Sequence, residues 1–156
     1  MNTTSTQTPS LFQAEDNQAI INRIRSLTHN SVPLWGKMNV AQMLVHCQQP
    51  LKSALGELPT KRRLIGRLFG AFAKKRILGE GGFGKNLPTD PMFLISDKHS
   101  FEEEKYNLIM LLERFLQSGP GAITKEPHPF FGKLTDEEWD TLQSKHLDHH
   151  LRQFGV

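Results

Sequence analysis

Residues 135–156 read TDEEWDTLQSKHLDHHLRQFGV, and this stretch has the features of a complete amphipathic helix. Thr135 is followed three positions later by Glu138, the spacing of a capping box in which each side chain bonds the backbone N–H of the other residue. Gly155, just beyond Phe154, is a common residue after a helix end. The sequence therefore predicts a helix from 135 to about 154.

Two histidines of this helix share its apolar face. At about 100° per residue, Trp139, His146 and His150 lie on one arc beside Leu142, and His149 lies off it. The spacing of four residues places the two imidazoles one turn apart, close enough for both to bind one ion. The helix lacks the HExxH pattern of zinc proteases, so it carries no glutamate base at that spacing.

Three more segments have helical periodicity, at about 15–27, 39–54 and 100–118. Apolar residues recur three or four positions apart in each of them. No segment alternates between apolar and polar residues for long enough to anchor a sheet. The predicted fold is therefore an all-α four-helix bundle, formed as a single domain by residues 11–156.

Local signals place the ends of these helices. Asn39 with Gln42, and Ser100 with Glu103, have the spacing of two further capping boxes. Pro50 is expected to kink the second helix or to end its regular hydrogen bonding.

An additional helix is predicted at 64–78, between the second and third of these segments. Its apolar stripe consists of Leu64, Ile65, Leu68, Phe69 and Phe72. Seven basic residues flank the stripe, and no acid lies among them: Lys61, Arg62, Arg63, Arg67, Lys74, Lys75 and Arg76. Two long loops rich in Gly and Pro, 79–91 and 119–134, complete the chain, and long loops in compact domains are often functional.

The basic segment 61–76 has three interpretations. The first is a solvated amphipathic helix, and the second is a surface that attracts an anionic thiol or a carboxylate substrate. Nucleic-acid or membrane-surface binding ranks last, because only Phe69 and Phe72 supply aromatic rings and no known binding motif accompanies them.

A third histidine lies on the second helix. His46 is at the margin of an apolar stripe that includes Met43 and Leu51. An unpaired buried polar group costs about 1–3 kcal/mol, so the ring needs a partner. A metal ion shared with His146 and His150 across the bundle would supply that partner.

Four stretches of the sequence resemble the DinB-like superfamily of metal-binding four-helix bundles, most closely a branch known only as a domain of unknown function. They are WGKMNVAQMLVHC at 35–47, KNLPTDP at 85–91, HPFFGKLTDEEW at 128–139 and KHLDHHLRQFGV at 145–156. Together they extend over nearly the whole chain after residue 10.

The resemblance implies a metal site and a range of chemistries. In that superfamily, one histidine of the second helix and an H-x3-H pair of the last helix hold Zn or Ni, and the matching residues here are His46, His146 and His150. Its members include enzymes that use a low-molecular-weight thiol in transfer or isomerisation, and some metal-dependent hydrolases. The ending differs from the usual H-H-R-G-Q of the superfamily, because Leu151 separates His150 from Arg152.

Two functional hypotheses follow. The first is a metal-dependent thiol transferase, isomerase or hydrolase, and the second is a non-catalytic metal-binding or stress-response module. His128, in HPFFG, is a candidate catalytic residue, but a rigid turn that buries Phe130 and Phe131 is the preferred interpretation. Cys47 is expected to be a packing residue, because its neighbour His46 points about 100° away.

Length and composition limit the remaining classes. The chain has 156 residues, 37% hydrophobic content, a net charge of +3 and one cysteine, so an intramolecular disulfide is excluded. We expect a cytoplasmic protein with a flexible leader at 1–10. The expected partner is a small-molecule substrate or thiol, with a homodimer as an option, and neither specific nucleic-acid nor membrane binding is predicted.

Overall fold

The computed structural model describes residues 8–59 and 61–156, and its secondary structure is helical. The helices found there are α1 Ala14–Ser26, α2 Val40–Ala54, α3 Leu64–Leu78, α4 Phe101–Ser118 and α5 Asp136–Gln153, with short 3-10 helices η1 Pro91–Phe93 and η2 Pro120–Ala122. Within these ranges there is no strand, only an isolated bridge between His128 and Gly132. The prediction of an all-α fold is confirmed.

The local signals act largely as expected. The Asn39–Gln42 and Thr135–Glu138 capping boxes form at the starts of α2 and α5. At α4, only half of the predicted capping box is found among the described residues: Ser100 accepts a hydrogen bond from the Glu103 backbone N–H. α2 continues through Pro50 to Ala54.

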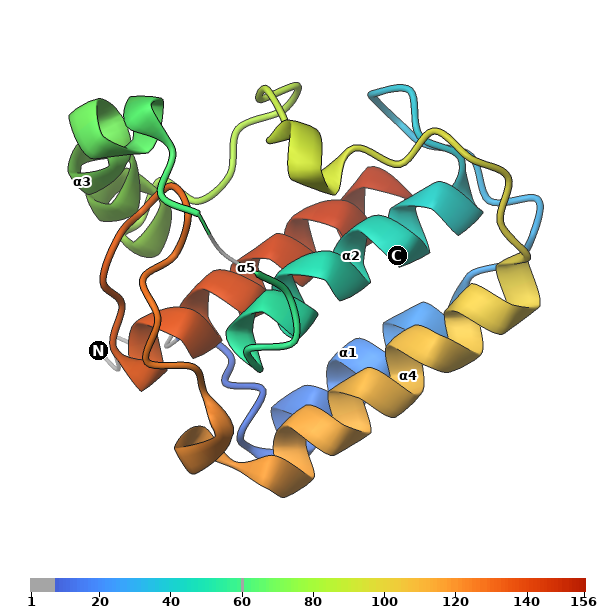
Figure 1. The fold of residues 1–156 in the computed structure, drawn as a ribbon. Coiled ribbons are helices and arrows are strands. Elements are labelled where there is room, and N and C mark those ends of the chain that lie inside the picture. The colour runs from blue at the N-terminus through green and yellow to red at the C-terminus, as the bar shows by residue number, and fades with distance from the viewer. Residues whose placement is uncertain (1–7, 60) are drawn as a thin grey trace, which may run out of the picture.

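Four of the helices enclose the core in two layers. In Figure 1, α2 and α5 lie side by side over α1 and α4, and α2 contacts both α4 and α5. The largest fully buried side chains come from all four helices and from the segments beside α1: Leu11, Ile21, Ile24, Leu27, Met43, Leu44, Leu51, Leu108, Leu112, Phe115, Trp139 and Leu147. The seam between α2 and α5 is the one that carries the histidines.

The chain before α1 is fixed to α5. The Asp140 carboxylate accepts hydrogen bonds from the Ser10 hydroxyl at 2.6 Å and from the Leu11 backbone N–H at 2.8 Å. Of the leader expected at 1–10, residues 1–7 lie outside the described residues.

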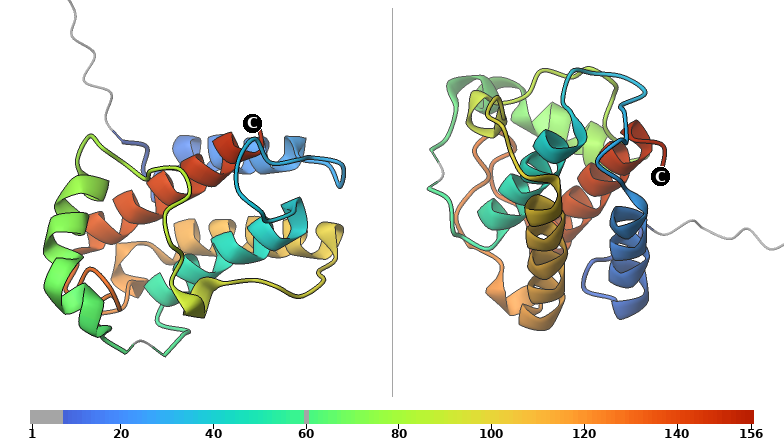
Figure 2. Two further views of the ribbon diagram at one scale, coloured as in Figure 1. Left: turned by 90° about the horizontal axis from the view of Figure 1, so that it is seen from above. Right: turned by 90° about the vertical axis from the view of Figure 1, so that its right-hand side faces the viewer.

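α3 lies at one end of the molecule, apart from the two layers, and contacts α5 (Figure 2). Its buried residues are Gly66, Gly70 and Ile77. The bulky apolar stripe of this helix faces outward. Across residues 8–59 and 61–156, no helix combines the length and the apolar character needed to cross a bilayer.

Candidate metal centre

Three histidines meet at the seam between α2 and α5. His46 comes from α2, and His146 and His150 come from successive turns of α5. The ring centroid of His46 lies 4.9 Å from that of His146 and 4.6 Å from that of His150. The centroids of His146 and His150 are 4.6 Å apart. One ring nitrogen from each residue lies within 4.8 Å of the others, so the three can hold a single metal ion.

A backbone carbonyl orients His46. Its Nδ1 lies 3.0 Å from the carbonyl oxygen of Phe93, in η1. A carbonyl only accepts, so Nδ1 carries the proton and donates. Nε2 of the neutral ring then has a lone pair, and it lies 3.0 Å from Nε2 of His146. Metal-bound histidines commonly have such an outer partner, which fixes the tautomer and the orientation of the ring.

A side-chain amide orients His150 in the same way. The Nδ1 of His150 lies 2.7 Å from Oε1 of Gln153, and Nε2 of Gln153 donates to the carbonyl oxygen of Trp35 at 2.7 Å. The contact with Trp35 determines which end of the amide is the donor, and therefore leaves the amide oxygen for His150. His150, like His46, is protonated on Nδ1 and keeps the lone pair of Nε2.

His146 completes the cluster, and neither neutral form of its ring satisfies both of its nitrogens. Its Nε2 lies 3.0 Å from Nε2 of His46, and its Nδ1 is enclosed by protein without a hydrogen-bond partner among the described residues. If Nε2 of His146 has no proton, two lone pairs face each other; if it has one, Nδ1 becomes a buried acceptor without a donor. A divalent cation shared by the three rings would remove this repulsion, so the donor set fits such a metal.

Burial keeps the three rings neutral. Desolvation lowers the pKa of His46, lowers that of His146 far below its ordinary value, and lowers that of His150 to about 3. The proximity of the other rings lowers the pKa of His146 and His150 further. Near pH 7 the lone pairs are therefore available without competition from protons.

Two aromatic side chains lie against the histidines of α5. The Phe83 ring contacts those of His146 and His149 at centroid distances of 5.4 and 5.9 Å, and Trp35 contacts His149 at 5.6 Å. The Lys85 ammonium lies 4.5 Å from the centre of the Trp35 ring. The loop 79–91 therefore places one aromatic ring, that of Phe83, against His146 of the cluster. Trp35, with Lys85 over its ring, lies against the neighbouring His149.

A family comparison bears on the whole chain. The family model described as "Protein of unknown function (DUF1569)" matches residues 6–155. The chain belongs to the DUF1569 family. Neither the curated proteins nor the solved structures contain a match to it.

In this DUF1569 protein, His128 lies outside the cluster. Its Nδ1 accepts hydrogen bonds from the backbone N–H groups of Phe130 and Phe131 at 3.0 and 3.1 Å, and its ring packs against Trp139 at 5.2 Å. Burial lowers the pKa of His128 to about 4, so the ring stays neutral and continues to accept these bonds. Its contacts are those of a hydrogen-bonded turn, in which Phe130 and Phe131 are only partly buried.

His149 and Cys47, neither of which the sequence predicted as a ligand, also lie outside the cluster. His149 packs edge-on against His150 at 5.0 Å but is not one of the three converging residues. Cys47 is buried, its thiol lies 3.6 Å from the Met43 sulfur, and burial raises its pKa. A buried neutral thiol of this kind is unreactive.

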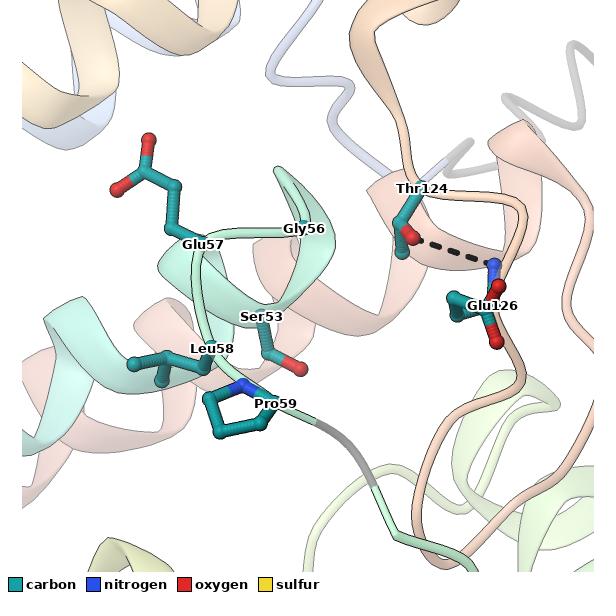
Figure 3. Close-up of a pocket in the computed structure, with 7 residues that line it drawn as sticks. All are labelled: Ser53, Gly56, Glu57, Leu58, Pro59, Thr124 and Glu126. Atoms are coloured by element: carbon teal, nitrogen blue, oxygen red, sulfur yellow. Dashed lines mark hydrogen bonds between the residues drawn. The ribbon is translucent and has the colours of Figure 1, made fainter.

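A surface pocket of the DUF1569 protein lies further along α2, away from the histidines. Figure 3 shows its lining, which is Ser53, Gly56, Glu57, Leu58, Pro59, Thr124 and Glu126. Ser53 is seven residues beyond His46, about two helical turns. Among the described residues that line this pocket there is no histidine, so it is separate from the metal centre.

The sequence did not reveal the residues that orient the ligands. Gln153 is three positions after His150, a spacing that puts both on one side of the helix, and this signal was available. The sequence could not indicate the contact with the Phe93 carbonyl, because every residue has a backbone carbonyl that can accept a hydrogen bond. The motif at 85–91 leads directly into η1, which places that carbonyl beside His46.

Proposed function

We propose that this DUF1569 protein is a divalent-metal protein with His46, His146 and His150 as its ligands, and that α1, α2, α4 and α5 form a DinB-like four-helix bundle. One observation carries the proposal: separate hydrogen bonds at Nδ1 leave the Nε2 lone pairs of His46 and His150 free, and one ring nitrogen of each residue lies within 4.8 Å of one of His146. Packing of histidines in a core does not by itself explain why a ring nitrogen from each of three residues converges at one place.

The donor set indicates the kind of metal. Three neutral imidazoles suit Zn or Ni better than Mg or Ca, which prefer oxygen ligands. Structural zinc sites are usually closed by four ligands rich in cysteine, whereas catalytic sites keep a position open. A site of three histidines fits the second kind.

The proposed activity is that of a thiol-dependent transferase or isomerase, or of a hydrolase. A bound Zn or Ni would ionise a thiol or a water near neutral pH. The chain would supply the rest of the site. Phe83 would exclude water beside His146, and Lys85, which lies over Trp35 next to His149, would attract a carboxylate of an anionic thiol such as glutathione.

A second candidate is a metal-binding module without catalysis. The hydrogen-bond partners of His46 and His150 are a carbonyl and an amide, neither of which transfers protons. His128, the candidate acid–base residue, is engaged with two backbone N–H groups. These contacts favour a site that binds a ligand and leaves it unchanged.

Elemental analysis of tag-free protein from metal-supplemented cells tests the metal site. We expect about one Zn or Ni per chain, and a folded protein without bound metal would contradict the proposal. Titration of Co-substituted protein with glutathione then tests the open position, because direct sulfur ligation adds a charge-transfer band. Turnover of thiol substrates separates the enzyme from the module.

A further inference from the structure

The strongest remaining feature is the outer face of α3. Five large apolar side chains of this helix are 58–76% exposed, and they are Leu64, Ile65, Leu68, Phe69 and Phe72. At about 100° per residue they occupy an arc of about 140° on one side of the helix. A soluble surface helix normally turns such a stripe toward the core.

The outward orientation follows from how α3 packs. Its opposite side carries Gly66 and Gly70, which lie against the backbone of Phe130. A Cβ atom at Gly66 would come 2.5 Å from the Phe130 carbonyl oxygen, and one at Gly70 would be closer still. Only glycine allows this close approach. The helix therefore cannot rotate to place its bulky apolar stripe against the turn, and the stripe faces outward.

Contacts at both ends hold the helix in this orientation. The Arg63 backbone N–H donates to the Pro129 carbonyl oxygen at 3.0 Å. At the other end, the Lys145 ammonium donates to the carbonyl oxygens of Ile77 and Leu78 at 3.0 and 3.1 Å. Lys74 is paired with Glu138 at 2.7 Å. The stripe is therefore presented on a fixed scaffold.

Positive charge surrounds the exposed stripe. Lys61, Arg67, Lys75 and Arg76 are exposed, and none forms an ion pair with any residue that the structure describes. Lys75 and Arg76 lie on the same side of the helix as the stripe, about one turn beyond Phe72. No Asp or Glu occurs between residues 61 and 79.

The sequence alone ranked membrane-surface binding last for the segment 61–76, and the exposure of the apolar stripe changes that order. We propose that α3 binds the surface of an anionic lipid bilayer, with its Leu, Ile and Phe side chains inserted at the boundary between headgroups and acyl chains and its basic side chains on the lipid phosphates. Helices with Leu and Phe on one face and Lys and Arg beside it bind membranes in this way. Anionic headgroups complement the unpaired cations. A second copy of the chain would bring another four cations against them, which like-charge repulsion opposes.

Co-sedimentation with vesicles tests the proposal on the full-length protein. One set of vesicles contains phosphatidylcholine alone, and the other contains phosphatidylcholine and phosphatidylglycerol in a three-to-one ratio. We expect binding to the anionic vesicles at least about tenfold stronger than to the neutral ones, and weaker at higher salt. Equal binding to both sets, or no binding to either, would overturn the proposal.

Paired variants test whether α3 is the binding element. Phe69→Ser with Phe72→Ser should reduce binding by about tenfold or more, because two inserted rings are lost. The matched control is Val32→Ser with Leu34→Ser, which removes apolar side chains of similar exposure, 71% and 70%, from another surface and should leave binding unchanged. All four positions are exposed, so circular dichroism should show unchanged folding.

A charge series completes the test. Lys75→Gln with Arg76→Gln should weaken binding to anionic vesicles, whereas Lys37→Gln with Lys98→Gln, which also removes two exposed cations, should not. Equal losses in both pairs would show nonspecific attraction and overturn the proposal. A stable dimer in analytical ultracentrifugation that the Phe69/Phe72 variant converts to a monomer would also overturn it, because the stripe would then belong to a second copy.

Discussion

The Nε2 atom of His46 on α2 lies 3.0 Å from the Nε2 atom of His146 on α5, although one hundred positions separate the two residues in the chain. The proton of His46 is already committed to the Phe93 carbonyl through Nδ1. The pair therefore has at most one proton to share, that of His146, and a metal ion would satisfy both atoms at once.

Alanine substitution should distinguish the proposed ligand His150 from the adjacent His149. His150→Ala should weaken Zn or Ni binding by more than the roughly 10–100-fold typical of losing an outer-shell partner, because a direct donor is lost. His149→Ala, one position away on the same helix, should retain metal because its ring is outside the converging set. Competition against a chromophoric chelator measures both affinities. Equal losses would show that the ligand assignment is wrong by one face of α5.

Gln153, which orients the His150 ring, should also affect the affinity for the metal. Gln153→Leu removes the acceptor of the His150 Nδ1 proton and should lower metal affinity about 10–100-fold. Gln153→Glu keeps an oxygen acceptor at that position and should retain more of the affinity. The same chelator competition applies, with circular dichroism of the metal-free proteins to confirm the fold. Unchanged affinity in the Gln153→Leu variant would show that Gln153 does not orient a metal ligand.

The close packing of α3 can be tested by adding one methyl group. Gly70→Ala should destabilise the protein by about 1–3 kcal/mol, because the new Cβ meets the Phe130 carbonyl oxygen and overpacking of this kind outweighs the better helix propensity of alanine. Gly121→Ala, where nothing lies within 4 Å of the added Cβ, is the control and should be nearly neutral. Urea unfolding of both variants gives the comparison. A stabilised Gly70 variant would mean that α3 is free to move away from the turn.

Protonation of His128 should destabilise the fold in mild acid. Its pKa is about 4 in the folded protein and near 6.5 in the unfolded chain, so between these values the unfolded state binds more protons. The free energy of unfolding should therefore fall as the pH drops from about 6.5 to 4, by up to about 3 kcal/mol from this residue.

His128→Asn provides the reference for that measurement. The amide oxygen of asparagine can accept the Phe130 and Phe131 N–H bonds in place of Nδ1, and it does not titrate in this range. Urea unfolding of metal-free protein at several pH values should show a shallower decline for the variant, since the other histidines are common to both proteins. Parallel declines would mean that His128 is not the group that titrates.

Several features could be predicted from the sequence because they depend on neighbours in the chain. The capping boxes at Asn39 and Thr135 join residues three positions apart, and both form. The helical repeat of 3.6 residues places His146 and His150 on one face of α5 whatever that face packs against. The all-α class follows from the same local periodicity.

The tertiary structure decided what those faces meet. The repeat in α3 defined a stripe containing Phe69 and Phe72 but not its direction, which depends on the close approach of Gly70 to the Phe130 backbone some sixty residues later. Likewise, the contact of His46 with His146 and with the Phe93 carbonyl depends on how α2, α5 and η1 pack together. Local hydrogen bonds and side-chain spacing determine where helices form, whereas long-range packing, which balances burial against steric fit over the whole chain, determines which atoms come together.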